Sequence, residues 1–189
     1  MIMGKFILVT GGARSGKSSF AESLAQKSNN ENGVLYIATS IPFDEEMKKR
    51  VKKHREQRPS GWTTLEAYRD FDVKLGEVGA GKKYILLDCI TLMVSNIILE
   101  KCIDWNILPE NAECEAEQEV TCEIEKLLSA VKALDVTFIA VTNEVGMGIV
   151  PENKLSRIFQ DIAGRVNQML AKNADDVYFC VSGIPVKIK

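Results

Sequence analysis

The residues best suited to chemistry lie near the start of the sequence, where a glycine-rich segment precedes a lysine and a serine. Residues 11–18 match the pattern G-x-x-x-x-G-K-[ST] and are Gly11, Gly12, Ala13, Arg14, Ser15, Gly16, Lys17 and Ser18. Glycines let successive backbone amides turn toward phosphate oxygens, Lys17 can bridge the β- and γ-phosphates, and the Ser18 hydroxyl can ligate Mg²⁺. An ordinary glycine-rich turn is the alternative. We predict that this segment is a phosphate loop for a nucleotide.

An acidic residue at the end of another strand could complete such a site. Residues 84–88 read Y-I-L-L-D, so Asp88 closes a short apolar strand. A carboxylate at this place holds Mg²⁺ directly or through water in phosphate-loop proteins. An aspartate that caps the following helix is the alternative, and the two roles can coexist. Ser18 and Asp88 are therefore the predicted metal ligands.

The one histidine of the chain lies on a predicted amphipathic helix at residues 42–58. At 100° per residue, Phe43, Met47 and His54 share one face, and Arg58 follows one turn later on that face. The spacing leaves two interpretations open. His54 is either a histidine satisfied within the core, or part of a group that faces an anionic ligand at the edge of the nucleotide site.

A further polar segment, T-N-E-V-G-M-G at residues 142–148, follows a predicted strand at residues 136–141. It should lie at the carboxyl edge of the sheet beside the phosphate loop, where doubly wound folds bind ligands. Glu144 could accept the proton of a substrate or ligate a metal, and a structural turn is the alternative.

Strands and amphipathic helices alternate along the chain, which predicts a mainly parallel sheet with helices on both faces. Strands are expected at residues 6–10, 34–38, 62–66, 84–88, 136–141, 177–181 and 186–188. Helices are expected at residues 17–28 and 42–58, along an apolar stripe at residues 120–131, and at residues 155–170, the last begun by Pro151 near its first turn. An acidic stretch at residues 104–119 is expected to be an exposed connector and helix start. We predict a single α/β nucleotide-binding domain over residues 1–189.

Composition excludes several other classes of protein. The 189 residues are 46% hydrophobic and 26% charged with a net charge of −2, which fits a globular chain and gives no electrostatic reason to expect nucleic acid as partner. The longest uncharged apolar stretch, residues 89–99, is too short for a membrane span. The five cysteines form no CxxC pair and are expected to be reduced and buried. No signal peptide precedes the first strand, so a cytoplasmic enzyme is expected.

Over nearly its whole length the sequence resembles the bifunctional adenosylcobinamide kinase / adenosylcobinamide-phosphate guanylyltransferase family. The matching pieces are ILVTGGARSGKS at residues 7–18, LYIATS at 35–40, H-x-x-x-R-P at 54–59, the acid followed by C-I-T at 88–91, TNEVGMGIVPEN at 142–153, R-x-F-x-D-I-A-G-R-V-N-Q at 157–168 and SGIPVKIK at 182–189. Two positions depart from some relatives, which carry Glu where this chain has Asp88 and a second histidine where it has Lys53.

The resemblance implies a P-loop, RecA-like three-layer sandwich that assembles as a homotrimer. It also implies two reactions: phosphorylation of adenosylcobinamide by ATP or GTP, then transfer of GMP from GTP to the resulting phosphate through a GMP-histidine, with release of pyrophosphate. His54 would be the nucleophile. The implied guanine-nucleotide contacts are residues 11–18, Thr39, Ser40, Ile41, Arg55, Glu56, Gln57, Arg58, Glu66 and Asp88.

Other phosphate-loop proteins fit the sequence less well. A GTP-dependent switch would carry an N-K-x-D motif, and residues 153–156 read N-K-L-S without the acid. A nucleic-acid motor would carry a basic patch interleaved with aromatic residues, which we do not find. A small-molecule kinase that lacks the transferase activity is the nearer alternative.

Overall fold

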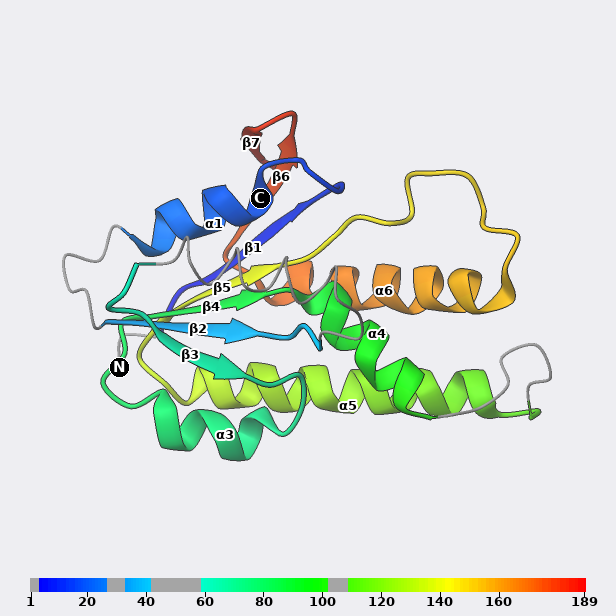
Figure 1. Cartoon of the computed structure of the whole chain (residues 1–189), viewed down its shortest axis with the longest axis horizontal. Coiled ribbons are helices and arrows are strands. Elements are labelled where there is room, and N and C mark those ends of the chain that lie inside the picture. Colours follow the sequence, from blue (N-terminus) through cyan, green and yellow to red (C-terminus); the bar gives the residue numbers. More distant parts are fainter. Residues whose placement is uncertain (1–3, 27–32, 42–58, 102–108) are drawn as a thin grey trace.

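The fold is built on a seven-stranded sheet (Figure 1). The computed structural model describes residues 4–26, 33–41, 59–101 and 109–189. The strands are β1 (Phe6–Gly11), β2 (Val34–Ala38), β3 (Thr63–Glu66), β4 (Tyr84–Asp88), β5 (Thr137–Val141), β6 (Asp176–Val181) and β7 (Ile184–Lys187). They lie side by side in the order β3-β2-β4-β5-β1-β6-β7, and every neighbouring pair is parallel except β6 and β7. The predicted parallel sheet and terminal hairpin are confirmed.

Helices cover both faces of the sheet, as predicted. They are α1 (Lys17–Ala25), α3 (Phe71–Val78), α4 (Ile90–Glu100), α5 (Ala112–Lys132) and α6 (Lys154–Asn173). Ile7 and Val9 of β1 pack with α1 on one face, whereas Phe6 and Leu8 belong to the cluster that α3, α4, α5 and α6 complete on the other. Because side chains alternate along β1, the core consists of two hydrophobic clusters, one on each face of the sheet.

One helix begins at another residue than the sequence suggested, and a second begins within the stretch that was predicted to contain a helix start. The helix predicted to start near Pro151 begins at Lys154, because the Asn153 side chain caps it by accepting a hydrogen bond from the Ser156 amide at 3.0 Å. Helix α5 begins at Ala112, within the acidic stretch that was predicted to be an exposed connector and helix start. Ala116 continues the buried stripe of α5 toward its amino end.

Strand β5 lies between β1 and β4, so the strand that ends in Asp88 is not adjacent to the one that ends in the phosphate loop. Val141 of β5 pairs with Val9 on one side and with Asp88 on the other. Asp88 is thus level with Val9 and about 10 Å away, two strand spacings. The segment that follows β5 consequently begins between the phosphate loop and Asp88.

The longest apolar stretch of the sequence forms α4 in the interior of the protein. Ile90, Met93 and Ile97 are each 1% exposed or less. Among the helices within the described ranges, none has both the length and the apolar character that crossing a membrane requires. The stretch is therefore explained by burial against the sheet, as its short length predicted.

The cysteines are not all buried, contrary to the expectation. Cys89 and Cys180 are buried, but Cys114 and Cys122 are exposed on α5. Their positions fall on the solvent side of an amphipathic helix, away from the stripe that contains Ala116 and Val120. Cys102 lies outside the described residues.

Candidate nucleotide site

The segment between β1 and α1 has the backbone conformation of an anion-binding loop. Gly16 is the N-cap of α1 with a φ of 88°, and no side chain caps the helix. The first amides of α1 are therefore left for another acceptor, and they carry the positive end of the helix dipole. Ala13 and Arg14 are exposed at the tip of the loop, where Arg14 also has a positive φ of 60°.

The cation of the predicted site lies inside this loop. Lys17 is only 8% exposed, and its Nζ donates a hydrogen bond to the Gly12 carbonyl at 2.9 Å. A buried ammonium held by one carbonyl is well placed to exchange that partner for the oxygens of a phosphate chain. The position of Lys17 thus fits the motif that predicted it.

Two buried hydroxyl groups accompany the loop without a hydrogen-bond partner among the described residues. They are Thr10 Oγ1, at the end of β1, and Ser15 Oγ, within the loop, in residues that are 8% and 7% exposed. Buried polar atoms normally have a protein or solvent partner. These two hydroxyl groups therefore leave hydrogen-bonding capacity at the loop for a polar ligand or water.

Asp88 does not act as a helix cap. Cys89 is the N-cap of α4, and no side chain bonds to the first amides of that helix. The Asp88 carboxylate instead accepts a hydrogen bond from the Tyr36 hydroxyl at 3.2 Å, and Tyr36 packs in the layer on the α1 side of the sheet. Asp88 therefore lies on the same side of the sheet as α1, whose first turn carries Lys17 and Ser18.

The neighbour of Asp88 is chemically inert. Burial raises the pKa of the Cys89 thiol to about 12, and the Asp88 carboxylate contributes in the same direction. The thiol is therefore protonated and uncharged at neutral pH. Cys89 supplies no nucleophile to the site.

A buried polar network fixes the segment that follows β5. The Thr142 hydroxyl donates to Asn167 Oδ1 of α6 at 2.7 Å, and Asn167 Nδ2 donates to the Asn143 carbonyl at 3.1 Å. The Asn143 amide donates to Thr91 Oγ1 of α4 at 2.6 Å. Two helices thus hold this segment against the end of the sheet.

Glu144 lies beside the phosphate loop, as the sequence predicted. Its amide donates to the Gly11 carbonyl at 3.1 Å. Its carboxylate accepts from the Gly146 amide at 3.2 Å, which is the bond of a local turn. The turn interpretation is therefore observed, and it leaves the second carboxylate oxygen for another partner.

Several of the predicted nucleotide contacts meet around one cavity at the ends of β2 and β3. Thr39, Ser40, Ile41 and Glu66 line this cavity of about 480 Å³ together with residues that the sequence did not indicate, among them Tyr68, Arg69 and Lys74. The Thr39 hydroxyl accepts from the Cys89 amide at 2.9 Å and donates to the Cys89 carbonyl at 2.7 Å. It therefore ties the end of β2 to the end of β4.

Five of the predicted site residues belong to one continuous segment of the sequence. His54, Arg55, Glu56, Gln57 and Arg58 lie outside the described residues, as does the predicted helix at residues 42–58. Within the described ranges, no three histidine, cysteine or acidic side chains come together as a metal site. A metal here would need oxygen ligands from the nucleotide.

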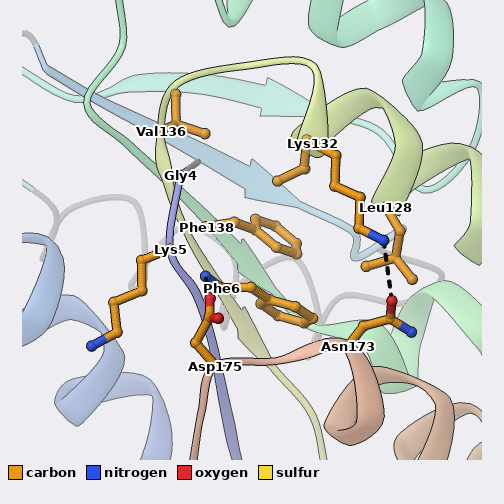
Figure 2. Close-up of a pocket in the computed structure, with 10 residues that line it drawn as sticks. Gly4, Lys5, Phe6, Leu128, Lys132, Val136, Phe138, Asn173 and Asp175 are labelled. Carbon is orange, nitrogen blue, oxygen red and sulfur yellow. Dashed lines mark hydrogen bonds between the residues drawn. The ribbon is translucent and has the colours of Figure 1, made fainter. Parts of the chain in front are cut away.

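A larger cavity, of about 590 Å³, lies at the amino ends of the strands, beside the starts of β1 and β5 (Figure 2). Its walls include Phe6 and Phe138, whose ring centroids are 5.0 Å apart. Lys132 donates to Asn173 Oδ1 at 3.2 Å on its rim. Because ligands of parallel α/β sheets bind at the carboxyl ends of the strands, this cavity is not the candidate site.

Comparison with known proteins agrees with these features. The family model described as cobinamide kinase / cobinamide phosphate guanyltransferase matches residues 7–188. The chain is 47% identical over 184 residues to the bifunctional adenosylcobalamin biosynthesis protein CobU of Escherichia coli and 48% identical to that of Salmonella typhimurium, covering 97% of this chain and 99% of each relative. It is 37% identical to the protein CobP of Pseudomonas aeruginosa, with 96% of both chains covered.

A solved structure supports the fold. A protein chain described as an ATPase domain superposes with a TM-score of 0.53 at 16% sequence identity, covering 93% of this chain and 68% of that one. The likeness concerns the fold alone, and it confirms the P-loop, RecA-like α/β architecture that the sequence resemblance implied.

Proposed function

The chain belongs to the cobinamide kinase / cobinamide phosphate guanyltransferase family, and from this premise we propose that it phosphorylates adenosylcobinamide and then joins GMP to the phosphate. The observation that carries the proposal is the phosphate loop, with a buried Lys17 inside it and an uncapped helix behind it. Both reactions act on a nucleoside triphosphate, so one loop can serve both.

In the kinase step the hydroxyl of the substrate attacks the γ-phosphorus of ATP or GTP. The new P–O bond replaces the bond to the β-phosphate oxygen, and the nucleoside diphosphate leaves. Loop amides and the Lys17 ammonium stabilise the negative charge on the phosphates. We assign acceptance of the hydroxyl proton to Glu144, because its amide is bonded to the Gly11 carbonyl and one carboxylate oxygen is outside the local turn.

The residues present fit a Mg²⁺ ion that arrives with the nucleotide. Such an ion needs octahedral oxygen ligands and takes one or two from the protein. Ser18 supplies a hydroxyl on the first turn of α1, and Asp88 supplies a carboxylate on the same side of the sheet. Bound there, the ion would neutralise charge on the phosphate oxygens.

In the transferase step we propose that His54 attacks the α-phosphorus of GTP. The N–P bond forms as the bond to the β-phosphate oxygen breaks, and pyrophosphate leaves with its charge balanced by Lys17 and the loop. The oxygen of the substrate phosphate then displaces the imidazole, which gives adenosylcobinamide-GDP. The attack requires a neutral imidazole, whose ring nitrogen has a free lone pair. Arg55 and Arg58 would balance charge on the phosphates.

We further propose that Thr39, Ser40, Ile41 and Glu66 contact the guanine nucleotide, because they share a cavity at the carboxyl edge of the sheet. Arg55, Glu56, Gln57 and Arg58 are proposed contacts on the strength of the resemblance. A homotrimer, a cytoplasmic location and a single catalytic domain over residues 1–189 belong to the same proposal.

Incubation with GTP labelled in its α-phosphate tests the transferase. The full-length chain should acquire an acid-labile label, and His54→Ala should not. Lys53→Ala is the matched control and should keep the label, because it changes the adjacent residue without removing the nucleophile. Label that persists in His54→Ala would refute the assigned nucleophile, and phosphorylation of cobinamide without any label would favour a kinase alone.

A further inference from the structure

The last strands of the chain form a tight hairpin whose turn has a defined conformation. Val181 of β6 pairs with Ile184 of β7, so the turn consists of Ser182 and Gly183. Both have positive φ values, 51° and 84°. Two residues in this conformation make the turn that matches the twist of a β-hairpin, and glycine is favoured in it.

This turn contacts the phosphate loop through backbone atoms. The Gly183 amide donates a hydrogen bond to the Ser15 carbonyl at 3.0 Å. A Cβ on Gly16 would lie 2.9 Å from the Gly183 Cα, and a Cβ on Gly11 would lie 2.6 Å from the Cys180 carbonyl oxygen. The hairpin therefore touches the loop at its first glycine and at its last, and both contacts require the absence of a side chain.

The base of the hairpin is held firmly to the rest of the protein. Asp176 is paired with Lys187 at 2.7 Å and with Lys5 at 2.5 Å, which joins β6 to β7 and to the start of β1. The ring of Tyr178 meets the ring of Phe20 of α1 at 5.0 Å. The C-terminal side chain also bonds to the end of α6: Lys189 Nζ donates to the carbonyls of Ala171, Lys172 and Ala174.

Core packing explains β6, which buries Val177 and Cys180, but it does not explain β7. All of the residues of β7 are exposed, including Ile184 at 65% and Val186 at 49%. The segment S-G-I-P-V-K-I-K at residues 182–189, which matches the family, likewise has no role in the mechanism above. Its contact with the phosphate loop is therefore the feature that calls for an explanation.

We propose that the Ser182–Gly183 turn is a positioning element of the nucleotide site. By bonding the Ser15 carbonyl and packing on Gly16, it holds the peptide that leads into α1, so that the amides of the loop converge on the triphosphate. Gly183 is the positioning residue, acting through its amide and its backbone conformation. The inference depends on the proposed function, because it assumes that the loop binds a nucleoside triphosphate.

Replacement of Gly183 by valine tests this. A β-branched side chain strongly disfavours a positive φ and so displaces the turn. The matched control is Gly81→Val. Gly81 has a φ of 76° and, like Gly183, open space where a Cβ would lie. It precedes β4 and so lies at the amino ends of the strands, away from the phosphate loop. Gly183→Asn should behave as the wild-type chain, because asparagine tolerates this conformation and keeps the amide.

The dissociation constant of Mg²⁺-GTP, measured by calorimetry on the full-length chain, should rise about tenfold in Gly183→Val. A tenfold change is about the effect of losing one well-placed hydrogen bond. It should change less than twofold in Gly81→Val, although both substitutions lower the melting temperature. If the valine chain does not fold, Gly183→Ala, which disfavours the positive φ less strongly, should weaken binding in the same direction by a smaller factor. Equal affinities in Gly183→Val and the wild-type chain, or equal weakening in Gly81→Val, would overturn the inference. Failure of the wild-type chain to bind GTP would instead refute the proposed function.

Discussion

Replacing Asn167 by alanine should measure what the buried polar network behind Glu144 contributes. Asn167 is 9% exposed, and its side chain accepts from the Thr142 hydroxyl and donates to the Asn143 carbonyl. The buried Thr142 hydroxyl would keep only its contact with Thr91 Oγ1, at 3.3 Å, and the Asn143 carbonyl, in a partly buried residue, would lose the Asn167 amide. Removing the partner of a buried polar group costs about 1–3 kcal/mol, so the free energy of unfolding should fall by roughly that amount.

Asn173→Ala is the control for this measurement. Asn173 lies on the same helix and also makes two side-chain hydrogen bonds, to the Met169 carbonyl and to Lys132, but it is exposed. Water replaces these partners, so the loss should be about 0.5 kcal/mol or less. Urea unfolding followed by circular dichroism gives both values, provided that the slopes agree. Equal losses at the two sites would show that burial of these hydrogen bonds adds nothing to the free energy of unfolding.

Three further outcomes are expected. Glu144→Gln should slow the kinase step about 10²- to 10⁴-fold. Labelling by α-labelled GTP and the melting temperature should not change, because the new side-chain oxygen can still accept the hydrogen bond from the Gly146 amide. An equal loss of labelling would contradict the role of proton acceptor. At pH 8 an alkylating reagent should modify Cys114 and Cys122 but not Cys89, whose pKa is about 12, as peptide mass spectrometry can check. The two lysines beside Asp176 lower the pKa of its carboxyl below the ordinary 3.8, so its contribution to stability should be complete above that pH and lost as pH falls through the lowered value. The stability difference between the wild-type chain and Asp176→Asn should accordingly shrink only in acid, and a difference that is constant down to pH 2 would contradict this.

The parts of the fold that the sequence predicted are those whose signals are local. The strands around Leu8, Ile37 and Ile139 are short runs of apolar residues, and such runs are typical of strands buried on both faces. The phosphate loop is likewise specified within eight neighbouring residues. Its residues could therefore be predicted without any knowledge of the tertiary structure.

Features that depend on long-range contact were not predictable in this way. Helix α3 buries only Phe71 and Leu75, too few for a periodic pattern. The polar residues Thr91 and Asn167 look like ordinary helical surface positions, and only the packing of α4 and α6 around one strand end reveals their partners.

The place of β1 in the sheet has a consequence for how the chain is made. Both strands that pair with β1 come much later in the sequence, and the Phe6 amide bonds to the carboxylate of Asp175, 169 residues away. Until the ribosome has added those residues, Leu8 and Val9 of β1 lack the neighbouring strands β5 and β6. An unpaired apolar strand is prone to aggregation. Chaperones that shield such strands, or slower synthesis at low temperature, should therefore raise the soluble yield, and chains cut before residue 176 should be recovered mainly in inclusion bodies.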